Sequence, residues 1–231
     1  FVSTLRYDIA HAISRLGQLS AAPTVGAMKA LDRVIQYLGV TSNFTIGGRL
    51  TTGNDVYRFM SDSDHSGDRG ISLKSQSGMF FLLNGIPVHW RSNKQPTTTD
   101  SSAASEIYAL SQAYKEARYF VWKCDEMGMQ VPSVIQMEVD NTQAISFQHK
   151  TCANTKLKGE FDLRWDWVKD LQDAKEVKTI HVDTMYNMAD LLTKCLSNTD
   201  FNRLVQLTQQ NNDRAVRLVQ FARAKVHDKP A

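Results

Sequence analysis

Four carboxylates stand at positions where a folded chain rarely tolerates a lone charge, and they restrict the possible folds more than any other feature. Asp62 and Asp140 each close a run of mostly apolar residues, so both are expected at the ends of strands. Glu106 stands at the head of an apolar stripe with helical spacing, which places it toward the core. Asp190 lies in a short helical pattern, residues 187–194, after a further apolar run. The order strand, helix, strand, helix predicts one fold that brings the four together.

Carboxylates that point into one site repel each other and stay protonated unless cations neutralise them. The sequence has no cluster of His or Cys beside them, and acidic oxygen ligands favour Mg²⁺ or Mn²⁺ over zinc. Two such ions about 4 Å apart can activate a water and stabilise the leaving oxygen of a phosphodiester. The plain alternative is that these are four of 24 acidic residues, most of them solvated. That alternative suits a single carboxylate better than a set in this order.

The segments around these carboxylates resemble a known family. Six motifs are similar, in the same order, to those of the ribonuclease H domain of copia-type LTR retrotransposon Pol polyproteins: residues 61–68, 75–85, 90–96, 101–110, 139–145 and 189–194. Residues 1–50 resemble the end of the reverse transcriptase that precedes this domain. The resemblance therefore covers residues 1–197.

The resemblance implies two bound ions, Mg²⁺ or Mn²⁺, and one set of residues that is both catalytic and metal-binding: Asp62, Glu106, Asp140 and Asp190. Asp64 competes for the first position, but the family's spacing to a second, non-essential acidic or serine position selects Asp62. One departure from the family pattern is Gly159-Glu160, where many copia-type chains carry a Lys-His pair. The family's basic side chains are therefore missing at that place.

A basic stretch is compatible with nucleic-acid binding. No Asp or Glu occurs in residues 69–99, whereas four cations give the stretch a local charge of +4: Arg69, Lys74, Arg91 and Lys94. Such a patch can bind the phosphates of a nucleic-acid backbone. The alternative is a solvated hairpin in which positive charges predominate by chance. Arg91 and Lys94 are predicted to contact phosphates. Asn141 and Gln143, beside Asp140, are predicted to lie near the scissile strand.

The predicted fold class is α/β, an RNase H-like mixed β-sheet flanked by helices, preceded by a small helical segment and followed by a helical tail. The predicted domains are a helical end of the reverse transcriptase at 1–50, an RNase H-like domain at 51–197 and a helical tail at 198–231. With 231 residues and 42% hydrophobic content, the chain can bury a full core. Three roles stay open for the tail: a cap, an oligomer contact or a basic lever against nucleic acid.

Individual elements follow from local patterns. Strands are predicted at 44–50, 55–62, 78–84, 86–91 and 177–182, and at a run that ends at Asp140, with Asn84-Gly85 as a hairpin turn. The first of two N-terminal helices is expected to end near Gly17 and the second to run to Gly39. The second helix should bury one face, made of Met28, Leu31, Ile35 and Leu38. Further helices are predicted at 141–149 and 160–174, where Trp165 and Trp167 should pack in the core rather than stack on bases.

The remaining sequence features concern surroundings and partners. Three widely spaced cysteines without a CxxC pair predict a reduced compartment and no structural zinc. No run of 18 apolar residues or signal peptide occurs, so no membrane association is predicted. Because Phe1 is not an initiator methionine, the chain is expected to be a fragment, a processed product or a trimmed piece. The resemblance implies a cytoplasmic location in a virus-like particle, and as partners an RNA–DNA hybrid and the upstream polymerase part of the same polyprotein. The oligomeric state does not follow.

The function that the resemblance implies is a metal-dependent ribonuclease H that cuts the RNA strand of RNA–DNA hybrids. One alternative is a catalytically silent or domesticated module that binds nucleic acid or serves as a scaffold. Another is an integrase-like or resolvase-like nuclease that cuts DNA. The position of Glu106 between the two strand-end aspartates argues against the last, since the integrase arrangement, by resemblance, places its glutamate last.

Overall fold

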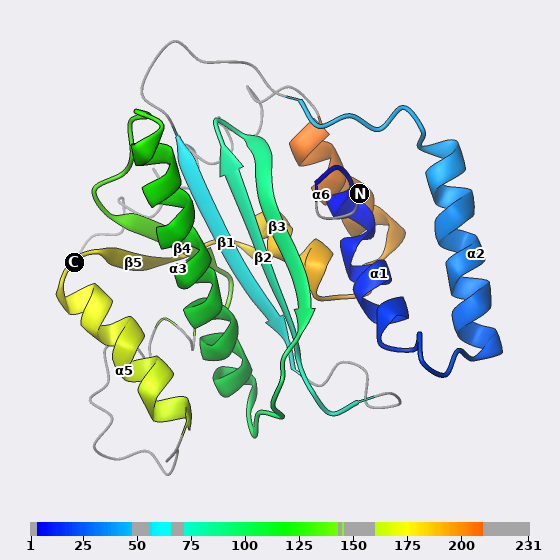
Figure 1. Ribbon diagram of the computed structural model, residues 1–231, viewed down its shortest axis with the longest axis horizontal. Coiled ribbons are helices and arrows are strands. Elements are labelled where there is room, and N and C mark those ends of the chain that lie inside the picture. Colours follow the sequence, from blue (N-terminus) through cyan, green and yellow to red (C-terminus); the bar gives the residue numbers. More distant parts are fainter. Residues whose placement is uncertain (1–3, 48–55, 66–71, 143–144, 146–159, 210–231) are drawn as a thin grey trace.

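The structure of the chain, a computed structural model, describes residues 4–47, 56–65, 72–142, 145 and 160–209. Its elements form a central sheet with helices on both faces (Figure 1). They follow one another in the order η1 (Tyr7–Ile9), α1 (Ala10–Gly17), α2 (Val25–Val40), β1 (Tyr57–Asp64), β2 (Gln76–Leu83), β3 (Ile86–Lys94), α3 (Ser102–Glu126), β4 (Ile135–Val139), α5 (Glu160–Asp173), β5 (Val177–His181), η3 (Thr184–Tyr186), η4 (Met188–Leu192) and α6 (Asn198–Gln209).

The sheet has five strands in the order β3-β2-β1-β4-β5. The first three strands form an antiparallel meander, whereas β4 is parallel to β1 and β5 is parallel to β4. Asn84 and Gly85 have φ angles of 53° and 76°, which build the tight turn between β2 and β3. The mixed sheet predicted from the sequence is therefore confirmed.

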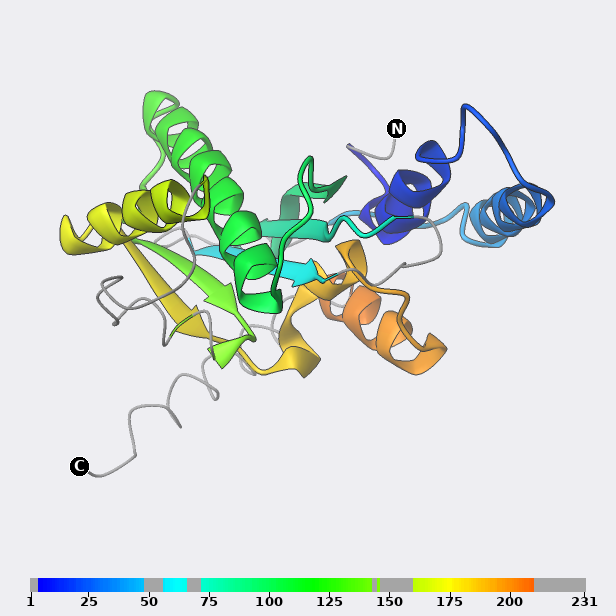
Figure 2. The same ribbon diagram turned by 90° about the horizontal axis from the view of Figure 1, so that it is seen from below.

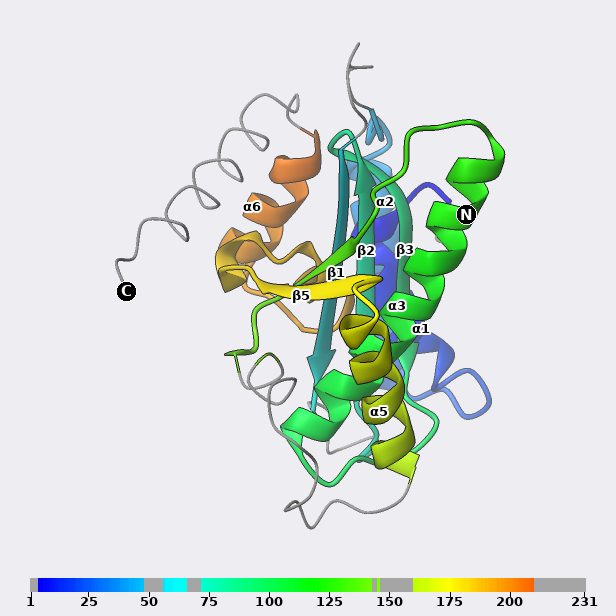
Figure 3. The same ribbon diagram turned by 90° about the vertical axis from the view of Figure 1, so that its left-hand side faces the viewer.

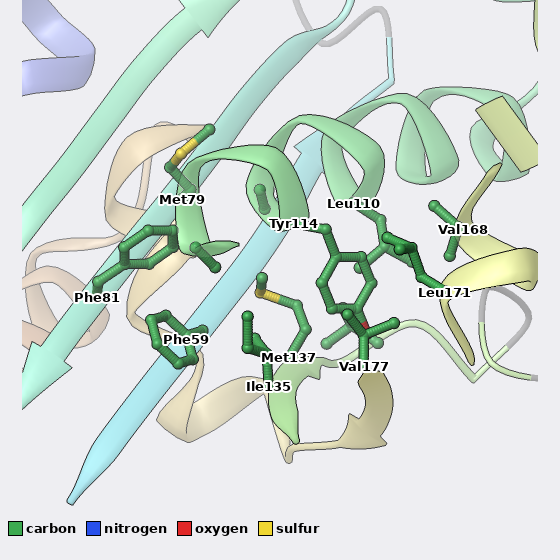
Figure 4. Close-up of a cluster of buried hydrophobic side chains, with 13 residues drawn as sticks. Phe59, Met79, Phe81, Leu110, Tyr114, Ile135, Met137, Val168, Leu171 and Val177 are labelled. Atoms are coloured by element: carbon green, nitrogen blue, oxygen red, sulfur yellow. The ribbon is translucent and has the colours of Figure 1, made fainter. Parts of the chain in front are cut away.

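The first hydrophobic core lies between the sheet and the helices α3 and α5 (Figure 4). Leu110, Ala113 and Ala117 of α3 are buried there, on the stripe that begins at Glu106. Trp165 is buried and Trp167 packs against the same cluster, so both belong to the core as predicted. This face fixes the position of α3 and with it the position of Glu106.

A second core covers the opposite face, so the sheet has helices on both sides (Figure 3). The ring of Tyr7 makes edge contacts with Phe80 and Trp90, at centroid distances of 5.1 and 5.6 Å. Leu204 and Val205 of α6 belong to the same cluster. Helix α1 runs along the β3 edge of the sheet (Figure 2), in contact with β3 and η4. Both the N-terminal segment and the first part of the tail thus pack on the sheet that carries the carboxylates.

Two local predictions were wrong. Helix α2 buries its predicted apolar face only in part, because helical periodicity shows which residues share a face but not how far that face is covered: Met28 and Ile35 are 51% and 57% exposed, whereas Leu31 and Leu38 are half-buried. Residues 44–47 form no strand, because Phe44 and Ile46 pack against the second core instead of pairing with a neighbouring strand. The rest of that predicted strand, most of the predicted helix at 141–149 and residues 210–231 lie outside the described residues.

Within the described ranges, no helix combines the length and the apolar character that crossing a membrane requires.

Candidate active site

Asp62 and Asp140 are brought together by two neighbouring parallel strands. Asp62 lies two residues before the end of β1, and Asp140 directly follows β4. The register pairs Met60 of β1 with Glu138 of β4. Because parallel neighbours end at the same edge of a sheet, the two carboxylates meet at this edge, as the strand-end pattern of the sequence predicted.

Asp190 reaches the same edge because η4 packs directly on a glycine of the sheet. Gly78 of β2 pairs with Asp62 of β1. A Cβ atom at Gly78 would lie 2.7 Å from the Thr193 methyl carbon and 2.8 Å from the Ala189 carbonyl oxygen. A residue with a side chain at position 78 would therefore push η4, and Asp190 with it, away from Asp62.

The three aspartates form one compact cluster. One carboxylate oxygen from each of Asp62, Asp140 and Asp190 lies within 4.8 Å of the others. Asp62 and Asp190 are buried, while Asp140 is partly exposed. Glu106 is buried at the start of α3, near enough for the charges of Asp62 and Asp140 to act on its carboxyl group, although it is outside the 4.8 Å group. Asp64, the rival for the first position, does not belong to the group among the described residues.

Burial and mutual repulsion make this cluster hard to ionise. Burial raises the pKa of Asp62, and the neighbouring Asp140 adds to the effect. The pKa of Glu106 is raised well above its ordinary value by burial and by the charges of Asp62 and Asp140. Burial and the charge of Asp62 raise the pKa of Asp190 to about 7. A cation at this place would relieve both costs.

Two residues that the sequence analysis left without a role take part in the site. The ammonium of Lys194 lies 3.2 Å from Asp62 Oδ1 and 3.0 Å from Asp190 Oδ1. The hydroxyl of Thr193 donates to Asp62 Oδ2. Burial alone would lower the pKa of Lys194, but the two carboxylates outweigh burial and raise it. The signal in the sequence was the spacing of four residues between Asp190 and Lys194, which places both side chains on one face.

The predicted nucleic-acid contacts are spread more widely. Arg91 and Lys94 line a pocket of about 220 Å³ between β3 and α3, and Arg91 also bonds Glu116 at 2.7 Å. Burial and the nearby cations Arg15 and Lys74 lower the pKa of Lys94, which marks a local concentration of positive charge.

Asn141 lies inside the carboxylate site, where its hydrogen bond to Glu106 partly offsets the raised pKa of that carboxyl group. Gln143 lies outside the described residues. The structure therefore brings Asn141, but not Arg91 or Lys94, to the carboxylate cluster.

The donor set fits a hard divalent cation. Within the described ranges the converging ligand atoms are carboxylate oxygens, which suit Mg²⁺ or Mn²⁺. Three negative groups face one ammonium, so the cluster keeps an excess of negative charge unless it is protonated. Burial, and after it this excess of negative charge, raise the carboxyl pKa values.

Comparison of the sequence with known proteins finds transposon polyproteins that match most of the chain. No family model matches the chain. The retrovirus-related Pol polyprotein from transposon RE1 of Arabidopsis thaliana is 27% identical over 202 residues, which cover 87% of this chain and 14% of that protein. The corresponding polyprotein from transposon TNT 1-94 of Nicotiana tabacum is 25% identical over 210 residues, which cover 90% of this chain and 15% of that protein. The chain thus spans only a small part of these relatives.

A shorter relative shares part of the chain. Secreted RxLR effector protein 161 of Plasmopara viticola is 42% identical over 118 residues, which cover 51% of this chain and 79% of that protein. Among solved structures, LC11-RNase H1 in complex with RNA/DNA hybrid aligns with a TM-score of 0.43 and 14% identity over 60% of this chain and 94% of that one. RNase H1 from Halobacterium salinarum aligns with a TM-score of 0.43 and 16% identity over 59% and 93%.

The mixed sheet, with helices on both faces and carboxylates at one edge, defines a ribonuclease H-like domain. Over most of its length the chain is similar to retrovirus-related Pol polyproteins of retrotransposons, at 25–27% identity, which supports a ribonuclease H domain of a retrotransposon Pol.

Proposed function

We propose that this domain is a ribonuclease H that cuts the RNA strand of RNA–DNA hybrids with the help of two Mg²⁺ or Mn²⁺ ions. The observation that carries the proposal is the meeting of Asp62, Asp140 and Asp190 at one edge of the sheet, with Glu106 beside them. Such a set has no structural purpose that would offset the cost of burying like charges. Its charge is useful only where cations are to be held.

The side chains of the site have separate roles in this proposal. Asp62, Glu106, Asp140 and Asp190 hold the metal, which when bound supplies an activated water and neutralises the leaving oxygen. Arg91 and Lys94 contact phosphates at the rim, where their charges add affinity without sequence preference. Asn141 holds Glu106, and Asn141 and Gln143 approach the scissile strand.

The domain acts, in the same proposal, within a Pol polyprotein. Its partners are then the RNA–DNA hybrid and the upstream polymerase part, and its location is a cytoplasmic virus-like particle. This context rests on the relationship to Pol polyproteins, of which the chain spans about one seventh.

The direct test is cleavage of a labelled RNA–DNA hybrid with Mg²⁺, beside duplex DNA and single-stranded RNA of the same sequence. A protein separates RNA from DNA through the 2′-hydroxyl and the groove shape it imposes, so only the RNA of the hybrid should be cut. Asp140→Asn should abolish cleavage and leave hybrid affinity unchanged or higher. Comparable cleavage of duplex DNA would replace this proposal by the integrase-like one.

A second candidate function is favoured by Lys194. Its ammonium already neutralises part of the carboxylate cluster, as a domain that no longer binds metal would require. The similarity to a secreted effector shows that related domains occur outside polyproteins. On this view the chain is a silent binding module, and Asp140→Asn would change neither cleavage nor Mn²⁺ binding.

A further inference from the structure

A partly buried chain of polar groups, with Gln76 buried at its centre, runs from helix α1 across the sheet to η4. The amide nitrogen of Gln76 donates to Ser14 Oγ on α1 and to Ser92 Oγ on β3, both at 2.9 Å. The hydroxyl of Ser92 then donates to the backbone carbonyl of Leu192 on η4, at 2.6 Å. These three hydrogen bonds, here called the Ser14–Leu192 relay, join segments far apart in the sequence.

The hydrogen bonds of the relay hold Gln76, Ser92 and Leu192 in one relative position. Gln76 is 3% exposed, so its amide hydrogens cannot exchange their partners for water without opening the structure. The donors point the same way along the relay, from Gln76 through Ser92 to Leu192, and hydrogen bonds aligned in this manner strengthen one another. Gly78 lies two residues further along β2 and receives η4 in direct contact.

The relay ends two residues from a carboxylate of the site. Leu192, whose carbonyl accepts the last bond, follows Asp190 on the same short helix. A 3₁₀ segment of this length has few internal bonds, so its place depends on what it packs against. Thr193, the next residue, bonds Asp62 directly. A displacement of Leu192 would therefore move Asp190 relative to Asp62.

We propose that Gln76 is a positioning residue: through Ser92 it holds η4, and thereby Asp190, at the carboxylate cluster, and through Ser14 it couples this position to helix α1. Helix α1 then helps to hold Asp190 in its place at the carboxylate cluster. Helix α1 belongs to the segment that resembles the end of a reverse transcriptase. A shift of that segment relative to the sheet would therefore displace Asp190 through the relay. The catalytic consequence rests on the proposed function, whereas the structural coupling does not.

The test compares two variants in the full chain with matched controls. Gln76→Met keeps the volume and removes both donors, and Ser14→Ala removes one hydroxyl from the far end. The controls are Gln18→Met, whose amide bonds the Ser14 carbonyl within the same helical segment, and Ser20→Ala, whose exposed hydroxyl bonds the Gly17 carbonyl. Ser14→Thr retains the hydroxyl and should behave like the wild type.

Three measurements separate positioning from general stability. Hydrogen exchange at the amides of Asp190, Thr193 and Lys194 should accelerate in both relay variants, while amides of α3 keep their wild-type rates. The Mn²⁺ dissociation constant, from calorimetry, should rise by about three- to tenfold, the range expected for one lost buried hydrogen bond. In hybrid cleavage, kcat should fall with KM unchanged.

Hydrogen exchange decides whether Gln76 positions η4. Unchanged exchange at η4 in Gln76→Met and Ser14→Ala, or an equal acceleration in α3 and η4, would overturn the positioning role. If Gln76→Met does not fold, Ser14→Ala carries the test alone, because a single hydroxyl near the surface of α1 is removed. A wild type that cuts no hybrid would refute the proposed function, while the exchange and Mn²⁺ data would still test the relay.

Discussion

Two groups of buried charges lie on the same pair of strands, and they solve the problem of burial in opposite ways. Arg58 of β1 and Glu138 of β4 form a two-pronged ion pair, with Nε–Oε1 at 2.9 Å and a second contact at 2.5 Å. Further along the same strands, Asp62 and Asp140 meet with Asp190 and share one ammonium, that of Lys194. The first group is electrically balanced and the second is not.

The difference shows which buried charges are structural. A buried pair in good geometry satisfies its own charges, so Arg58 and Glu138 need nothing from outside the chain. The aspartate cluster raises its own pKa values and needs a proton or a further cation. Strand position alone is therefore no mark of a functional charge, whereas an uncompensated excess is.

The largest expected effect comes from removing a charge from the unbalanced group. Asp62→Asn should reduce hybrid cleavage by about a thousandfold or more, because it removes a metal ligand without changing shape. Its thermal stability should stay equal or rise, since one repulsive buried charge is gone. Single-turnover cleavage and thermal unfolding of the same sample measure both. Cleavage within tenfold of the wild type would show that the cluster is not the catalytic centre.

The matched change in the balanced group should have the opposite result. Glu138→Gln leaves Arg58 buried without its charge partner and should cost about 3–5 kcal/mol of unfolding free energy. Urea unfolding measures this cost, and Mn²⁺ affinity of the folded protein should not change. Replacing both partners together, Arg58→Met with Glu138→Leu, should recover most of the stability. A full loss of Mn²⁺ binding in Glu138→Gln would instead place the ion pair within the site.

The pH dependence should differ between the wild type and Asp190→Asn. The pKa of Asp190 is raised to about 7, above its unfolded value, so its contribution to stability is present in acid and lost as pH rises through about 7. The unfolding free energy of the metal-free wild type, relative to Asp190→Asn, should therefore fall between about pH 4 and about pH 7.

His11 contributes equally to the pH dependence of the unfolding free energy of the wild type and of Asp190→Asn, so its contribution cancels in the difference between them. Burial lowers the pKa of His11 to about 4, so that its effect on stability has the opposite sign. Saturating Mn²⁺ should abolish the slope of the difference, because a bound cation keeps the carboxylates ionised. A difference that stays flat or rises with pH would mean that folding does not raise the pKa of Asp190.

Replacing Lys194 shows how much of the negative charge of the aspartate cluster its ammonium already neutralises. Lys194→Met removes the competing ammonium, so Mn²⁺ should bind about five- to tenfold more tightly, as measured by calorimetry. The metal-free protein should at the same time melt at a lower temperature. Weaker Mn²⁺ binding would show that the ammonium supports the bound state, and no binding by either protein would favour the silent module.

The smallest effects are expected at the rim, outside both groups. Lys94→Ala should weaken hybrid binding and reduce the salt dependence of affinity by about one counterion. Arg91→Ala should do less, because Arg91 already pairs with Glu116. Affinities across a salt series, with inactive Asp140→Asn as background, measure both slopes. Equal slopes for the wild type and Lys94→Ala would remove Lys94 from the phosphate contacts.

The sequence predicted the sheet and its two strand-end aspartates because local periodicity decides such features. Alternating and closed apolar runs located β1 and β4, and Asn84-Gly85 located the hairpin. The helical stripe behind Glu106 was equally local, and Leu110 and Ala113 are buried as expected. The catalytic roles given to these residues stay predictions.

The misses share one cause, which is that periodicity shows a face but not what covers it. The apolar positions of α2 followed the helical period, yet Met28 and Ile35 are exposed. Phe44 and Ile46 had a strand-like pattern and instead pack on the second core. Whether such a face is covered, and by what, depends on residues distant in the chain.

The sequence by itself determined which residues carry charge, which runs are apolar and in what order they come, because these depend on composition and spacing alone. Only the tertiary structure decided that Lys194 stands among the aspartates, that Gly78 makes room for η4 and that Gln76 bonds helix α1 to it. These contacts join segments more than 60 residues apart, for Ser14 and Gln76 as for Asp62 and Lys194. No local pattern encodes such distances, because they arise when packing brings separate elements to one place.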